Sequence, residues 1–181
     1  MQPSKRHWPL LLATLALLVA SEARAQEPWL AGATSLPGNS RPLGVGIKLG
    51  SPIAATMKYY FTDVHAVEVS VGMGLGGGLA AQTDVSYLYH VYLAHYPRFS
   101  LPLYVGAGTR ISIWPGEGHY IGHEREGAVG IGFSAPVGIA FNFKRTPMDV
   151  FAEVSTGIGV VPSVPRAGLF IDGAAGLRFY F

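Results

Sequence analysis

Apolar and polar residues alternate along nearly the whole chain from Arg41 onward. A period of two indicates β-strands whose two faces meet different surroundings. The alternation divides into eight segments, at 43–49, 55–61, 67–75, 84–94, 101–113, 129–143, 150–160 and 169–181. An even number of antiparallel strands is the pattern of a single-chain bacterial membrane barrel. The sequence therefore predicts an all-β fold, an eight-stranded antiparallel up-and-down transmembrane β-barrel.

Alternate residues of each predicted strand form two rows, one on each face, and the two rows differ sharply in charge. The apolar rows hold no ionised residue, whereas the opposite rows hold both signs: Lys48, Lys58, Glu68, Asp84, Arg110, Glu153, Asp172 and Arg178. Only 13% of the chain is charged, against about 25% in soluble domains. We therefore expect the apolar rows to contact lipid and the ionised groups to pair inside the lumen. Because an eight-stranded barrel is just wide enough to be filled by side chains, we expect a plugged interior.

The connections between the predicted strands differ in length at the two ends of the barrel. Tight turns at 62–65, 96–99 and 144–147 are predicted on the periplasmic side. Connections at 50–53, 76–82, 114–126 and 161–168 are predicted on the outer side, where longer loops are usual. The first of these is short, which departs from the pattern. The other three are the predicted elements for contact with extracellular partners.

The N-terminus has the three parts of a secretory signal peptide. Lys5 and Arg6 precede the apolar segment 10–20, and residues 23–25 read Ala-Arg-Ala, a cleavage pattern. The predicted domains are a signal peptide at 1–25, a flexible lead-in or plug at 26–40 and the barrel at 41–181. The signal segment carries the whole formal net charge of +2, so the mature chain is neutral and lacks the basic face of a nucleic-acid binder. There is no cysteine, which excludes disulfides and a lipidated cysteine anchor.

The last strand resembles a known signal. Gly176-Leu-Arg-Phe179-Tyr-Phe181 is similar to the C-terminal segment by which the outer-membrane assembly machinery recognises its substrates. With the signal peptide and eight strands, the chain resembles the small OmpA/OmpX-type barrels of Gram-negative bacteria. The resemblance implies an outer-membrane location, contact with membrane lipids and lipopolysaccharide, and insertion by the barrel-assembly machinery, with Gly176, Phe179 and Phe181 as the assembly signal. It implies little about activity, because function belongs to sites and not to folds.

Two short motifs suggest cofactor or metal chemistry. The segment 72–77 matches the GxGxxG pattern, but a dinucleotide site needs a helix after it and another strand is predicted instead. We therefore expect no cofactor. His119 and His123, with Glu117, Glu124 or Glu126, have side chains that can bind a divalent cation. The glycines between them favour a solvated loop, and we expect no bound metal.

Enzymatic and transport functions remain as alternatives to a structural or surface-interaction barrel. Lipid A deacylases are eight-stranded barrels with a His-x-Ser pair, which this chain lacks. A grouping of Ser86, His90 and Glu68 is conceivable, although a buried polar pair is the simpler interpretation. The inner charges could instead line a narrow, porin-like path for ions or small solutes.

Overall fold

The computed structural model describes residues 37, 41–74, 80–120, 123–162 and 164–181, without the side chains of 115–120, 123–127 and 164–166. They belong to one compact unit, Thr34–Phe181. The predicted signal peptide and all of the lead-in except Pro37 lie outside the described residues. Within them, no helix is long and apolar enough to cross a membrane.

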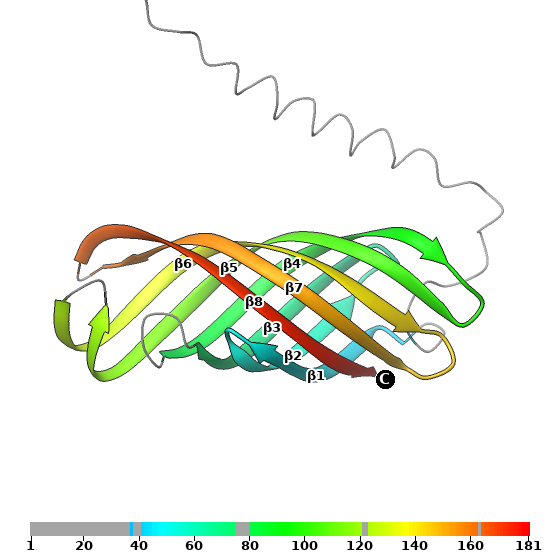
Figure 1. Cartoon of the computed structure of the whole chain (residues 1–181), viewed down its shortest axis with the longest axis horizontal. Coiled ribbons are helices and arrows are strands. Elements are labelled where there is room, and N and C mark those ends of the chain that lie inside the picture. The colour runs from blue at the N-terminus through cyan, green and yellow to red at the C-terminus, as the bar shows by residue number, and fades with distance from the viewer. Residues whose placement is uncertain (1–36, 38–40, 75–79, 121–122, 163) are drawn as a thin grey trace, which may run out of the picture. The chain divides into compact units, whose positions relative to one another are not determined.

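The described chain forms a closed antiparallel barrel in which every strand pairs with its sequence neighbours and the last pairs with the first (Figure 1). The strands are β1 (Leu43–Gly50), β2 (Ile53–Tyr60), β3 (His65–Gly74), β4 (Ala80–His95), β5 (Phe99–Tyr120), β6 (His123–Phe143), β7 (Met148–Val161) and β8 (Val164–Tyr180). The prediction of an all-β, eight-stranded, up-and-down barrel is thereby confirmed.

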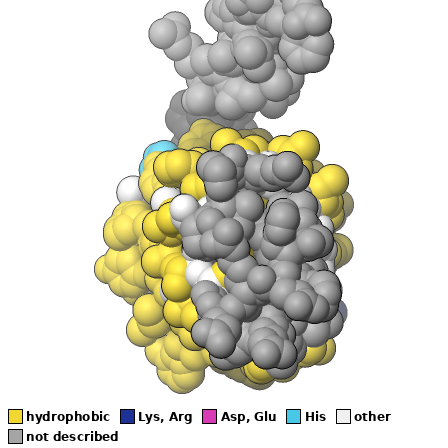
Figure 2. All heavy atoms as spheres, turned by 90° about the vertical axis from the view of Figure 1, so that its left-hand side faces the viewer, with side chains coloured by type: hydrophobic (Ala, Val, Ile, Leu, Met, Phe, Trp, Pro, Cys, Tyr) yellow, Lys and Arg dark blue, Asp and Glu magenta, His cyan; other side chains and the backbone are white. Residues whose placement is uncertain are grey.

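The apolar rows face outward along every strand. Side chains such as Ile47, Met57, Val105 and Val154 are exposed, whereas their neighbours along the strand are turned into the lumen. Figure 2, an end-on view, shows hydrophobic side chains around the perimeter beside the residues that are not described. No Asp, Glu, Lys or Arg faces outward from the described strand side chains. This exterior is the kind that hydrocarbon accepts.

The barrel wall is much taller on one side than on the other. β1 and β2 have 8 residues each, whereas β5 has 22 and β6 has 21. In Figure 1 the β1–β2 hairpin stops well short of the end that the β5–β6 and β7–β8 hairpins reach. The short predicted connection 50–53 is the top of this low hairpin.

Two of the predicted outer connections are wrong. The segments 114–126 and 161–168 were expected as irregular loops, but β5 and β6 continue to Tyr120 and from His123, and β7 and β8 to Val161 and from Val164. The ladder continues because pairing satisfies backbone groups wherever two strands already run side by side. Apolar and polar residues do not alternate over 114–126, so this segment carries no period-two signal of a strand. The turns predicted for the periplasmic side lie within one residue of their predicted positions.

Candidate functional site

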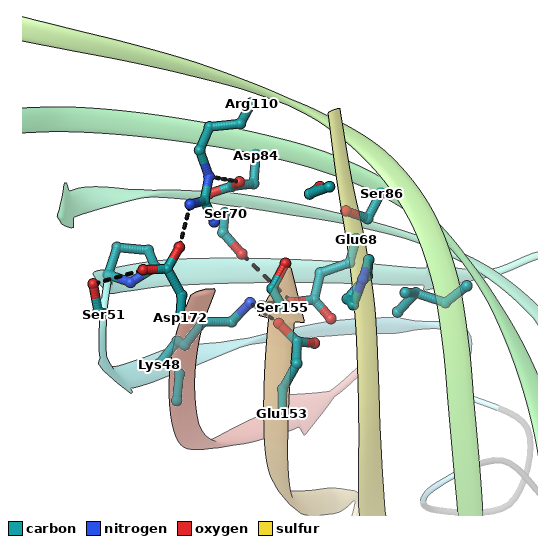
Figure 3. Close-up of a pocket in the computed structure, with 15 residues that line it drawn as sticks. Lys48, Ser51, Glu68, Ser70, Asp84, Ser86, Arg110, Glu153, Ser155 and Asp172 are labelled. Atoms are coloured by element: carbon teal, nitrogen blue, oxygen red, sulfur yellow. Dashed lines mark hydrogen bonds and ion pairs between the residues drawn. The ribbon is translucent and has the colours of Figure 1, made fainter. Parts of the chain in front are cut away.

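The candidate site is the charged lumen. The structure places all eight predicted charged residues on the inner face of the barrel, on β1, β2, β3, β4, β5, β7 and β8. Figure 3 shows six of them, Lys48, Glu68, Asp84, Arg110, Glu153 and Asp172, pointing toward one another across the interior. They form two clusters, and one cation stands apart from both.

The first cluster joins side chains from five strands, β1, β3, β5, β7 and β8. Lys48 Nζ lies 3.0 Å from Glu68 Oε1 and 3.0 Å from Glu153 Oε1. Arg178 Nη1 donates to the other oxygen of Glu68. The Tyr104 hydroxyl donates to Glu153 Oε2 at 3.0 Å. Each carboxylate therefore has at least two partners, and Glu68 also accepts from the Thr56 hydroxyl at 3.2 Å, as a buried charge requires.

Asp149 belongs to the same cluster and was missed from the sequence. Its carboxylate accepts from Arg178 Nε at 3.1 Å and from the Tyr180 hydroxyl at 2.6 Å, and it is fully buried. The predicted strand began one residue later, at Val150. The alternation of side chains along a strand was the available signal. Asp149 lies an even number of residues before Glu153, so both side chains point to the inner face.

The second cluster lies nearer the outer end of the lumen. Arg110 Nε donates to Asp84 Oδ1 at 2.6 Å, and Arg110 Nη1 donates to Asp172. Ser51, in the β1–β2 turn, donates to Asp172 Oδ1 at 3.0 Å. The Arg110 guanidinium also lies 4.2 Å from the centroid of the Phe170 ring, within cation–π range.

Lys58 is the cation outside both clusters. It is fully buried, and its Nζ makes no hydrogen bond within the described chain. It lies 4.7 Å from the ring centroid of Tyr104 and 5.0 Å from that of Tyr60. Aromatic faces therefore substitute for a carboxylate at this position.

The lumen is closely packed around these charges. Gly176 leaves room for Phe151, since a Cβ at Gly176 would lie only 2.6 Å from Phe151 Cζ. Phe151 in turn lies under the Arg178 guanidinium, with 3.9 Å from Cζ of Arg178 to the ring centroid. The cavity that remains between the two clusters has a volume of about 20 Å³. That is room for one or two water molecules and not for a solute.

The structure does not assemble the conceivable Ser86, His90 and Glu68 grouping. Glu68 is opposite Ser86 in the β3–β4 register, but its carboxylate is engaged by Lys48 and Arg178. His90 lies four residues along the strand from Ser86, about 13 Å away at the usual rise. Its ring nitrogens lie 3.4 Å from the Tyr60 hydroxyl and 3.2 Å from the Val64 carbonyl oxygen.

The other predicted positions are placed as follows. His119 and His123 lie at the tip of the β5–β6 hairpin, and their side chains are outside the described part. Where side chains are described, no three His, Asp or Glu residues are placed to hold a metal ion. The GxGxxG segment leaves the described chain after Gly74, and strand β4 begins at Ala80. In the predicted assembly signal, Gly176 faces inward and Phe179 and Phe181 are exposed on the outside.

Comparisons with known proteins bear on the fold. No family model matches the sequence, and no curated protein matches it. Among solved structures, the chain is similar to the N-terminal β-barrel domain of OprF from Pseudomonas aeruginosa, with a TM-score of 0.57 and 16% sequence identity. The match covers 77% of this chain and 95% of that domain. The chain has the fold of a small OmpA-type outer-membrane barrel. The resemblance predicted from the sequence is therefore confirmed for the fold, here an OmpA-type barrel with salt bridges buried inside.

Proposed function

We propose that the protein is an integral barrel of the bacterial outer membrane whose lumen is closed, and that it acts as a structural or surface-presenting element. The observation that carries the proposal is the combination of an uncharged exterior with ion pairs that cross the interior. Arg178 joins β8 to β3 and β7, and Lys48 joins β1 to β3 and β7. Such a network fixes the wall and fills the passage at once.

The same features support the proposed location. An uncharged outward surface contacts lipid without the free-energy penalty of a buried charge. In addition, the N-terminal segment has the pattern of an export signal. Lipopolysaccharide, membrane lipids and the barrel-assembly machinery are the partners that such a location supplies. The tall β5–β6 and β7–β8 hairpins extend farthest from the periplasmic turns. They are the proposed surface for extracellular partners, whose identity the proposal leaves open.

The closed lumen argues against a porin-like channel. A conducting path would need to pass the Lys48–Glu153 and Arg178–Glu68 pairs, where the cavity is about 20 Å³. A lipid A deacylase needs a nucleophile, a base and an orienting group within hydrogen-bond reach, and His90 has other partners. The structural proposal is the one that uses the observed contacts.

Two measurements test the proposal. Membrane fractionation with a gel run before and after boiling is expected to place the protein in the outer membrane, with a mobility that changes on heating. Planar-bilayer recording of the purified protein is expected to show no stable conductance. Recovery in the soluble periplasmic fraction would overturn the location, and reproducible single-channel steps would overturn the closed lumen.

A further inference from the structure

The turns at the end of the barrel where the chain terminates differ in charge. The β4–β5 and β6–β7 turns hold Arg98, Lys144 and Arg145 and no carboxylate, whereas the β2–β3 turn holds Asp63 and no cation. The backbone N–H of Lys144 donates to the carbonyl oxygen of Arg98 at 3.0 Å, which joins the two cationic turns directly. Figure 1 shows both turns at the same end of the barrel as the C-terminus. The turn cations are therefore gathered on one side of this end.

These cations have no anionic partner within the described chain. Arg98 is exposed and Lys144 is partly exposed, and neither makes an ion pair with a described residue. The carboxylate nearest to Lys144 along the chain is Asp149, which is fully buried and already accepts from Arg178 and Tyr180. Two adjoining turns with cations and no carboxylate create a local positive potential, which attracts an external anion.

A row of aromatic rings begins at the same two turns. The ring centroid of Tyr96 lies 4.7 Å from that of Phe99, and Phe99 lies 6.2 Å from Phe141. Tyr96 is 50% exposed and Phe141, on the outward face of β6, is 44% exposed. Exposed aromatic rings are typical of the border between hydrocarbon and headgroups in membrane barrels. With the membrane location proposed above, Arg98 and Lys144 lie at the level of the lipid headgroups.

An anionic phospholipid matches both features of this surface. Arg98 can bind phosphate oxygens with its planar fork of donors, and Lys144 can add a second positive charge. The acyl chains of the same molecule can contact the rings of Tyr96 and Phe141, which a soluble anion would leave exposed. A zwitterionic headgroup is a poorer match, because its own ammonium is repelled by the two cations.

We propose that Arg98 and Lys144 bind the phosphodiester of one anionic phospholipid of the phosphatidylglycerol type, taken from the leaflet that surrounds this end of the barrel. The proposal rests on the membrane location proposed above. The two cations select the headgroup by its charge, and the aromatic rings hold the adjoining part of the acyl chains.

Native mass spectrometry of the full chain, with either phosphatidylglycerol or phosphatidylethanolamine titrated into the detergent, tests the proposal. The parent chain is expected to retain one phosphatidylglycerol, with an affinity about tenfold higher than for phosphatidylethanolamine. Arg98→Gln with Lys144→Gln is expected to bind the two lipids equally. Arg125→Gln with Arg166→Gln removes the same charge from the β5–β6 and β7–β8 hairpins at the other end, and is expected to keep the preference.

A further variant separates the contact with the rings from the contact with the charges. Tyr96→Ser removes one exposed ring and keeps both cations. It is expected to weaken the binding of both lipids by a similar factor and to leave their ratio unchanged. Raising the ionic strength should have the opposite effect and reduce the preference for phosphatidylglycerol, because salt screens exposed charges.

Every variant is first checked for the folded, heat-modifiable form in the outer-membrane fraction. A failure of the proposed location would be seen there, before any lipid is added. Equal affinity of the parent chain for the two lipids would overturn the site, as would an unchanged preference after Arg98→Gln with Lys144→Gln. Loss of the preference in the Arg125 and Arg166 control would show that total charge selects the lipid, and an unchanged affinity in Tyr96→Ser would overturn the contact with the rings.

Discussion

Arg178 on β8 donates to Glu68 on β3, across the lumen and across 110 positions of sequence. The same guanidinium also binds Asp149 on the adjacent strand β7 and is fully buried. β1 and β2 lie between β8 and β3 in the wall, so this contact spans the strands where the barrel closes on itself. The pair therefore links the last strand to the early part of the barrel independently of the backbone ladder.

Removing the guanidinium should destabilise the barrel strongly. Arg178→Met leaves Glu68 and Asp149 buried with one partner fewer, and breaking a buried ion pair from one side typically costs about 3–5 kcal/mol. Urea unfolding in phospholipid vesicles, followed by tryptophan fluorescence, measures the change in the free energy of unfolding.

The charge-balanced triple variant separates lost pairing from lost packing. Arg178→Met with Glu68→Gln and Asp149→Asn removes the uncompensated charges and should recover a large part of the loss. Arg145→Met, at an exposed position in the β6–β7 turn, should leave unfolding unchanged. A triple variant no more stable than Arg178→Met would show that charge compensation is not what this cluster provides.

The two buried lysines should respond differently to the same substitution. Lys48→Met leaves Glu68 and Glu153 without a shared ammonium partner, whereas Lys58 makes no hydrogen bond in the described chain. Losing an unmatched donor costs less than leaving acceptors unsatisfied. Lys58→Met is therefore expected to unfold at a higher urea concentration than Lys48→Met, and the reverse order would contradict the assigned partners.

Two glycines of β8 provide a matched test of lumen packing. A Cβ at Gly176 would lie 2.2 Å from the Ile47 carbonyl oxygen and 2.6 Å from Phe151 Cζ, whereas nothing lies within 4 Å of a Cβ at Gly173. Overpacking of a filled interior costs about 1–3 kcal/mol, so Gly176→Ala should be destabilised by that amount. Gly173→Ala should be close to the parent in the same unfolding titration. Equal effects at the two positions would mean that Gly176 is not packed against the β1 backbone and Phe151 as the structure shows.

A cation on the outward face should be penalised according to its depth. Val105 is exposed on the outside of β5 near the middle of the apolar band, and Ile113 lies eight residues farther toward the outer end. Val105→Arg is expected to cost about 2–4 kcal/mol and Ile113→Arg about 0–1 kcal/mol, as lipid-facing cations do. Unfolding titrations in vesicles of defined composition measure both. A larger cost at Ile113 than at Val105 would place the membrane elsewhere on the barrel.

Much of this architecture could be read from the alternation of residues, and particular failures show where that signal ends. Each of the strands was predictable because its outer face is apolar and its inner face belongs to a packed, polar interior, so segments such as Val67–Met73 carry a strong period of two. The β5–β6 tip had no such contrast and was predicted as a loop. Asp149 was missed because it lies beside a turn and precedes the first apolar, outward-facing residue of the predicted strand.

The partners within the lumen could not be read from the chain. Alternation predicts that Lys48 and Lys58 both point into the lumen. Only the shear of the closed barrel decides that Lys48 meets two carboxylates and Lys58 meets two tyrosines. The unpaired part of the β8 edge in the described chain likewise depends on register. The short 50–53 connection marks the end of β1, but only the register shows that β8 continues past that point.

Protein–lipid nuclear Overhauser effects test the orientation of the two faces most directly, without any substitution. In lipid nanodiscs with methyl-labelled protein, cross-peaks from the acyl-chain methylene protons are expected at the outward methyls of Val105, Val137 and Val154. None is expected at Leu88, Ala66 or Ala140, which are buried in the lumen. Acyl-chain cross-peaks at these inner methyls, with water cross-peaks at the three valines, would contradict the placement of lipid outside and charge inside.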